Sequence, residues 1–214
     1  MNIFTGFREK YLQRRGQRML MRGDHEKAYK IFEKNLFLNN SPQNQYNLSV
    51  ALIGLGRYRE ADNFLSKLSE QYPDNEMILT CLGETSLMLG KWQNAIDIFE
   101  KLKSLNKFRK LYEKYSEISK DPILRDKFTT ARKKINLAQK EIGAGNYKKA
   151  LELLKFAAEL QPDDAWLMNN IGSLMLTLKE NPRDAYPYFE KAVILNPDNE
   201  KFKNNLSAVK KRIR

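Results

Sequence analysis

The stretch GRYREADNFLSKL at residues 56–68 sets a pattern that the rest of the chain repeats. A glycine is followed two residues later by an aromatic side chain, five later by an alanine and nine later by a large apolar side chain. The same offsets return in GDHEKAYKIFEKN from Gly23, GKWQNAIDIFEKL from Gly90 and GNYKKALELLKFA from Gly145, with His25 in the aromatic place of the first. A weaker copy, ENPRDAYPYFEKA, starts at Glu180. Five copies in phase predict an internal structural repeat.

The period of this repeat is close to 34 residues. Gly23 and Gly56 lie 33 residues apart, and Gly56 and Gly90 lie 34 apart. From Gly90 to Gly145 the distance is 55 residues, which is one period plus an insert of 21. Upstream of each turn, a small residue recurs, nearly always after an apolar one: Gly16, Ser49, Gly83, Ala138 and Gly172.

Each period is expected to form two amphipathic helices. In the second copy the apolar positions fall three or four residues apart, at Leu48, Leu52 and Leu55 and then at Tyr58, Ala61, Leu65 and Leu68. Gly56 between them is expected to supply the left-handed turn that ends the first helix, near 42–55. The aromatic is expected to wedge between units and the alanine to lie where helices touch. One such pair cannot bury its apolar face, so the copies must stack.

These residues closely resemble the tetratricopeptide repeat family, whose pattern calls for an apolar–Gly pair, a turn Gly, an aromatic, two alanines, a Phe and a Pro. The best matches are Ile171–Gly172, Gly90–Trp92–Ala95–Phe99 and Ala185–Phe189–Ala192–Pro197. The resemblance implies an all-α, right-handed superhelical solenoid of about five helix pairs. It also implies a protein that binds other proteins.

We expect three parts along the chain. An N-terminal array covers 1–106, with units near 9–41, 42–75 and 76–106. A basic helical connector follows at 107–127. The C-terminal array covers 128–214, with units near 131–164 and 165–198 and a capping helix at 199–214.

Apolar spacing supports the last two parts. The connector places Phe108, Leu111, Tyr112 and Tyr115 at helical intervals, and Pro122 is expected to open a long helix that ends near Gly143. In the final segment, Phe202, Leu206, Val209 and Ile213 fall along one stripe, as a terminal helix with an apolar inner face requires.

In proteins of this family, the first helix of each unit lines a concave groove that receives an extended peptide or a partner helix. The resemblance carries the family's peptide-binding asparagine to Asn47, Asn136, Asn170 and Asn204. An amide can donate and accept hydrogen bonds at once, which suits a peptide backbone. The residues expected around these asparagines are Gln43, Tyr46, Val50, Arg132, Gln139, Trp166 and Asn169.

A narrower family role, the grip on the C-terminal carboxylate of heat-shock chaperones, is disfavoured. It requires a lysine, two asparagines, a second lysine and an arginine at set groove positions. The N-terminal array instead has Gln13, Gln17, Asn47, Met77 and Cys81 there, and only Asn47 matches. Without cations, two adjacent carboxylates would be bound weakly.

Composition argues against catalysis and against cofactors. The chain has one His and one Cys, His25 and Cys81, which cannot form a zinc site by themselves. No phosphate-binding glycine loop, nucleophile elbow or HExxH helix occurs. We therefore expect a non-enzymatic scaffold without cofactor. A single cysteine and an N-terminus without the features of a secretory signal lead us to expect a cytoplasmic protein.

The net charge of +12 is unevenly distributed. The segments 1–22, 101–149 and 201–214 carry +5, +10 and +6, and the remainder sums to −9. Basic segments suit an acidic protein partner. The alternative is association with nucleic acid or an anionic membrane surface.

The N-terminal segment leaves two interpretations open. Ile3, Phe4, Phe7 and Tyr11 form an apolar edge beside Arg8, Lys10, Arg14, Arg15 and Arg18. This edge could lie in a lipid interface, or it could cover the open end of the first unit. We favour the cover.

Overall fold

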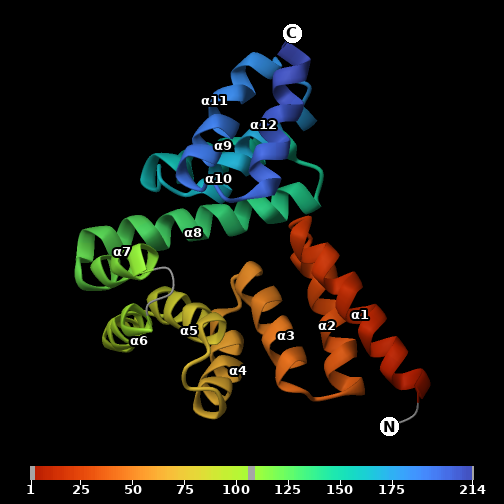
Figure 1. The fold of residues 1–214 in the computed structure, drawn as a ribbon, viewed down its shortest axis with the longest axis vertical. Helices are drawn as coiled ribbons and strands as arrows, with labels where there is room; N and C mark the ends of the chain where they lie inside the picture. Colours follow the sequence, from red (N-terminus) through yellow and green to blue (C-terminus); the bar gives the residue numbers. More distant parts are fainter. Residues whose placement is uncertain (1–2, 106–108, 214) are drawn as a thin grey trace. The chain divides into compact units, whose positions relative to one another are not determined.

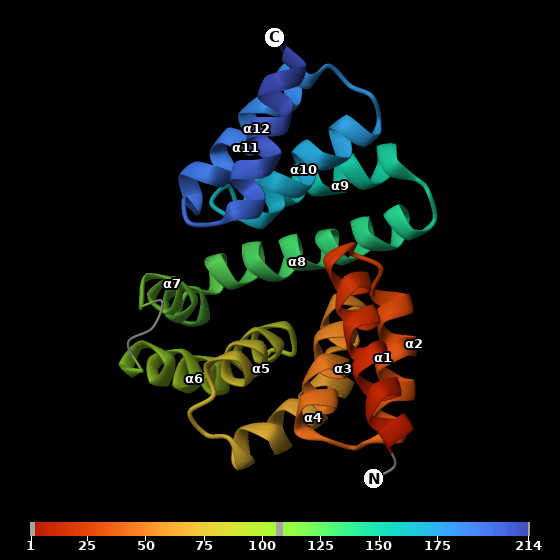
Figure 2. The ribbon, with the colours of Figure 1, turned by 45° about the vertical axis from the view of Figure 1, so that its right-hand side comes forward.

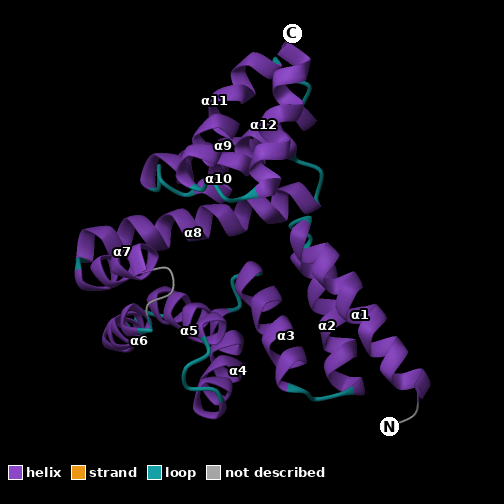
Figure 3. Cartoon of the chain, viewed as in Figure 1, coloured by secondary structure: helices purple, strands orange, loops and turns teal. Residues whose placement is uncertain are grey.

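The computed structural model describes residues 3–105 and 109–213, and within these ranges the chain forms twelve α-helices joined by turns, with no strand (Figures 1 and 3). The helices are α1 (Ile3–Met21), α2 (His25–Leu38), α3 (Pro42–Gly54), α4 (Tyr58–Gln71), α5 (Glu76–Met88), α6 (Trp92–Ser104), α7 (Arg109–Lys120), α8 (Pro122–Gly143), α9 (Tyr147–Leu160), α10 (Ala165–Thr177), α11 (Pro182–Leu195) and α12 (Glu200–Ile213). The predicted all-α fold is confirmed.

The helices divide into two compact units, Met1–Asp126 and Lys127–Arg214. In unit 1, α1/α2, α3/α4 and α5/α6 pack as hairpins and α7 packs against α6 (Figure 2). In unit 2, α10 pairs with α11, and α12 packs against α11. Helix α8 begins at Pro122, as expected, and continues without a break through residue 127. The three-part division stays a prediction, and its boundary at 106–107, like Phe108, lies outside the described residues.

Glycine ends the first helix of four of the sequence repeats, as their pattern predicts. Gly56 has φ +75°, and the same left-handed conformation recurs at the other three turn glycines, Gly23, Gly90 and Gly145. In this conformation Gly56 N–H donates to Ile53 O at 2.9 Å and Arg57 N–H donates to Leu52 O at 2.9 Å. These bonds satisfy carbonyls that the helix end would otherwise leave unpaired.

In the fifth repeat, the turn lies one residue earlier than the sequence pattern predicts. The pattern places Glu180 in the turn, but the left-handed residue is Lys179, with φ 60°. Lys179 N–H donates to Leu176 O at 3.1 Å and Glu180 N–H to Met175 O at 3.0 Å, which repeats the bonding of the glycine turns. Four residues separate α10 from α11, against three at the other turns, so the motif is displaced by one.

Within a hairpin, the small residue of the first helix lies against the large one of the second. A Cβ added at Gly83 would lie 2.6 Å from Phe99 Cζ, and one added at Gly172 would lie 2.9 Å from Phe189 Cζ. Gly16 faces Phe32 in the same way. Where the small residue is Ser49 or Ala138, the residue 16 positions later is the smaller Leu65 or Leu154. The two positions therefore share one fixed volume.

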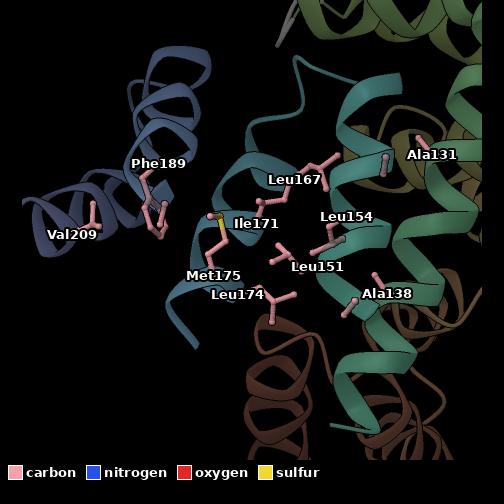
Figure 4. Packing of buried hydrophobic residues seen from close by; sticks show 13 residues of the cluster. Ala131, Ala138, Leu151, Leu154, Leu167, Ile171, Leu174, Met175, Phe189 and Val209 are labelled. Atoms are coloured by element: carbon pink, nitrogen blue, oxygen red, sulfur yellow. The ribbon is translucent and has the colours of Figure 1, made fainter. Parts of the chain in front are cut away.

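The repeat alanines lie where the helices touch, as predicted: Ala28, Ala61, Ala95, Ala150 and Ala185 are all fully buried. In unit 2 one apolar cluster runs from Ala131 and Ala138 of α8 through α9 and α10 to Phe189 of α11 and Val209 of α12 (Figure 4). A second cluster joins Met168 of α10, Ala192 of α11 and Phe202 of α12. Val209 and Phe202 are buried, which fits the expected inner face of the terminal helix.

Substitution of Gly83 tests the shared volume. Gly83→Ala should destabilise unit 1 by about 1–2 kcal/mol, because Phe99 is fully buried and stacks on Tyr115 at 4.8 Å between ring centroids, so it cannot move aside. Adding Phe99→Leu should offset part of this loss, giving a favourable coupling of about 1 kcal/mol in urea denaturation. Gly143→Ala is the control: nothing lies within 4 Å of its Cβ position, so stability should not fall. Additive effects of the two substitutions would contradict the shared volume.

His25 occupies the aromatic position of the first unit and packs against Gly54 of α3. Neither ring nitrogen has a hydrogen-bond partner in the described part of the chain. Burial lowers the pKa of His25, and the nearby Asp24 carboxylate opposes this shift only in part. The folded state therefore favours the neutral ring.

This burial predicts a pH dependence. The stability that neutral His25 contributes is fully present above the unfolded-state pKa of about 6.5, and it is lost as pH falls below that value, because the unfolded chain takes up the proton first. His25→Tyr restores the aromatic found at Tyr58 and Tyr147 and should lose less stability between pH 7.5 and 5, as urea midpoints measure. Equal losses in both proteins would show that His25 has no such role.

Candidate functional site

The predicted groove residues of unit 1 lie on one face of α3. Ser41 caps this helix, its Oγ accepting from Asn44 N–H at 3.3 Å, and Pro42 occupies the first turn. Residues three or four apart on a helix share one face. This spacing joins Gln43 to Tyr46 and Asn47, and both of these to Val50.

Two of these residues line a pocket between the N-terminal ends of α3 and α5. The pocket encloses ≈ 370 Å³, and its lining is Ser41, Pro42, Gln43, Tyr46, Tyr72, Asn75, Met77 and Ile78. The Met77 side chain is 61% exposed and Tyr72 is 42% exposed, so both offer apolar surface at the rim. None of the lining residues is charged.

Asn47 does not line the pocket, but it bonds to Gln43, which does. Its side chain is buried, and its Oδ1 accepts a hydrogen bond from Gln43 Nε2 at 3.1 Å. This bond orients the Gln43 amide at the pocket rim. Val50 is half-buried and does not line the pocket.

Tyr46 is a neutral hydroxyl at ordinary pH. Burial raises its pKa above the usual range, and its hydroxyl lies 3.7 Å from Cys81 Sγ. No group of three metal-ligating side chains occurs in the part of the chain that the structure describes. With an uncharged lining and a neutral Tyr46 hydroxyl, this pocket offers apolar contact and neutral hydrogen bonds.

In unit 2, α10 carries three of the predicted residues, and they divide between surface and interior. Trp166 is half exposed, with its ring edge-on to Phe202 of α12 at 4.8 Å between centroids. Asn170, one turn later, is exposed. Asn169 is buried, and its Oδ1 accepts from Asn205 Nδ2 at 2.7 Å, so its amide joins α10 to α12.

The other predicted residues of unit 2 lie on α8 and α12. Arg132 places its guanidinium carbon 5.3 Å from the ring centre of Phe128, and Asn136 and Gln139 are half-buried on the same helix. Asn204 is exposed on α12. The eleven predicted residues thus belong to two units, four to the first and seven to the second.

The sequence analysis missed a second pocket, of ≈ 290 Å³, formed between α10, α11 and α12. Its lining is Ser173, Leu176, Thr177, Phe189, Asn205, Ala208 and Arg212. Helical spacing held the signal for it, because Ser173 and Thr177 continue the α10 face that begins at Trp166 and Asn170. In unit 1, Tyr72 and Asn75 were also missed because they lie in or beside the loop before α5.

Successive helix hairpins that share a continuous apolar interior define a helical-repeat protein. Two family models match the chain: anaphase-promoting complex, cyclosome, subunit 3, over residues 21–102, and tetratricopeptide repeat, over residues 135–200. With the repeat geometry, these matches show that the chain belongs to the tetratricopeptide repeat family. Members of this family generally serve as protein–protein interaction scaffolds.

Solved structures resemble the chain at low identity. MamA from Desulfovibrio magneticus RS-1 is 20% identical, with a TM-score of 0.43, covering 90% of this chain and 97% of that one. A thermophilic TPR protein from Thermus thermophilus is 18% identical, with a TM-score of 0.47 and coverage of 94% and 98%. The TPR domain of P58(IPK) is 20% identical, with a TM-score of 0.46 and coverage of 96% and 55%. No curated protein sequence matches the chain.

Proposed function

We propose that the chain is a non-catalytic scaffold that binds an extended segment of a partner protein across α3 and α5 of unit 1. The observation that carries this proposal is the uncharged pocket between the two helices, with exposed Met77 and Tyr72 at its rim. A surface methionine and tyrosine side by side expose apolar area that a bound ligand would remove from water.

The pocket suits one apolar side chain of an extended peptide. Met77 has a flexible, polarizable side chain that adapts to different apolar groups, and Tyr46 and Tyr72 offer flat rings with a polar edge. Gln43 can donate to a peptide carbonyl and accept from a peptide N–H, and its bond to Asn47 limits its rotation. A helical ligand would meet the pocket with one side chain and leave the Gln43 amide without a backbone partner, since its own backbone groups are already paired.

Because the pocket lining is uncharged, binding at this point does not require an acidic partner. With no charged residue in the lining, the free energy of binding should come from apolar contact and neutral hydrogen bonds. Affinity should then change little with salt, unlike the affinity of a phosphate-binding surface, which falls steeply.

A peptide selected from a random display library against the full chain tests this proposal. Met77→Ala and Tyr46→Ala should each weaken its binding about tenfold, as truncation of a central apolar anchor does, when fluorescence anisotropy measures Kd. The matched control is Ile194→Ala on α11, 72% exposed but outside the pocket, which should leave Kd unchanged. Raising the salt should alter Kd by less than about threefold.

Three results would count against the proposal. They are failure of the folded chain to select any peptide, equal binding by all three variants, and loss of binding as salt is raised. Circular dichroism and urea midpoints should first show that each variant keeps the wild-type fold.

A further inference from the structure

The outward face of α1 combines exposed aromatic side chains with cations. Phe7, Tyr11 and Met21 are 72%, 57% and 69% exposed. At 100° per residue, these three share one side of the helix with Arg14 and Arg18. The expectation that the apolar edge covers the first unit is therefore wrong for Phe7 and Tyr11, while the side chains of Ile3 and Phe4 lie outside the described residues.

The opposite side of α1 makes the contacts with the rest of unit 1. Helix α1 packs against α2 and α3 (Figure 2). Leu12 is buried, and Gly16 faces the Phe32 ring. Packing therefore holds the helix in place without using Phe7 or Tyr11.

Charge on the outward face has one sign. Six cations are exposed on α1 or directly after it: Arg8, Lys10, Arg14, Arg15, Arg18 and Arg22. The one acidic residue of the segment, Glu9, is half-buried, and its carboxylate accepts from Asn39 Nδ2 at 3.0 Å and Asn44 Nδ2 at 3.0 Å. Glu9 is thus bound on the inner side and does not neutralise the outer one.

We propose that this face docks flat on a lipid bilayer that contains anionic lipids. A helix with aromatics at the middle of its exposed face and cations around them matches the apolar boundary and the anionic headgroups of a membrane surface. The rings enter the headgroup boundary, and the arginines and lysine contact lipid phosphates. None of the described helices combines the length and apolar character needed to cross a bilayer, so the contact proposed is peripheral.

Aromatic placement favours a bilayer over nucleic acid. Binding to a phosphate backbone would need the cations alone and would leave Phe7 and Tyr11 in water. Contact with a bilayer would be stabilised both by the aromatic rings and by the cations. It also uses a helix that contributes nothing to the α3–α5 pocket, so it stands independently of the proposed peptide site.

Vesicle co-sedimentation of the full chain tests the proposal. Wild type should bind phosphatidylcholine vesicles that contain phosphatidylserine much more tightly than pure phosphatidylcholine vesicles, and raised salt should weaken binding. Phe7→Ser with Tyr11→Ser should weaken binding at least about tenfold. Arg14→Gln with Arg18→Gln should weaken it on the order of 25-fold, because each surface cation contributes about fivefold.

Two matched variants control for general loss of apolar surface or charge. Phe37→Ser with Ile194→Ser removes side chains that are 92% and 72% exposed on other helices. Lys148→Gln with Lys211→Gln removes two exposed cations elsewhere. Neither should change vesicle binding by more than about twofold if α1 is the docking surface.

Several outcomes would overturn the proposal. One is wild-type protein that binds neither type of vesicle at low salt, and another is control variants that lose as much binding as the α1 variants. A third is binding to duplex DNA as tight as to vesicles that falls with Arg14→Gln and Arg18→Gln but not with the aromatic variant. That result would assign the face to a nucleic acid.

Discussion

The contact between a small residue and a ring, repeated in the hairpins, is the constraint on which the structure depends. Gly83 has no side chain because Phe99 fills the space where a Cβ would lie. Gly16 with Phe32 and Gly172 with Phe189 repeat this contact, so the two helix backbones approach closely in each of these units. Since interiors are packed to a nearly fixed density, a larger side chain at this contact on one helix requires a smaller one on the other.

This close approach also determines which residues remain available to a ligand. The inner faces of the helices are buried, because they carry the hairpin contacts and the repeat alanines. The N-terminal parts of α3 and α5 are left with Tyr46 and Met77 at the surface. The same division leaves Phe7 and Tyr11 on the outer side of α1. The two proposed binding surfaces are therefore helix faces that stacking leaves exposed, and they differ in charge because stacking imposes no charge on them.

Repetition explains why so much could be inferred from the sequence and also where inference failed. Gly56 in its left-handed turn and α8 starting at Pro122 followed from local rules, since a turn and a helix start depend on a few adjacent residues. The fifth turn was misplaced because one additional residue moved the left-handed position to Lys179. Asn169 was assigned to the groove face, yet its partner Asn205 lies on another helix, which spacing within one helix cannot reveal.

By itself, the sequence determined the all-α class, the turn glycines and the buried alanines. These features follow from short-range periodicity and from backbone conformations that only a few residue types adopt readily. Tertiary structure alone decided that Tyr46, Tyr72 and Met77 meet in one pocket and that Phe7 stays exposed. The physical reason is that burial and neighbourhood depend on which helix packs against which face. That choice is made by the shapes of side chains distant in the sequence.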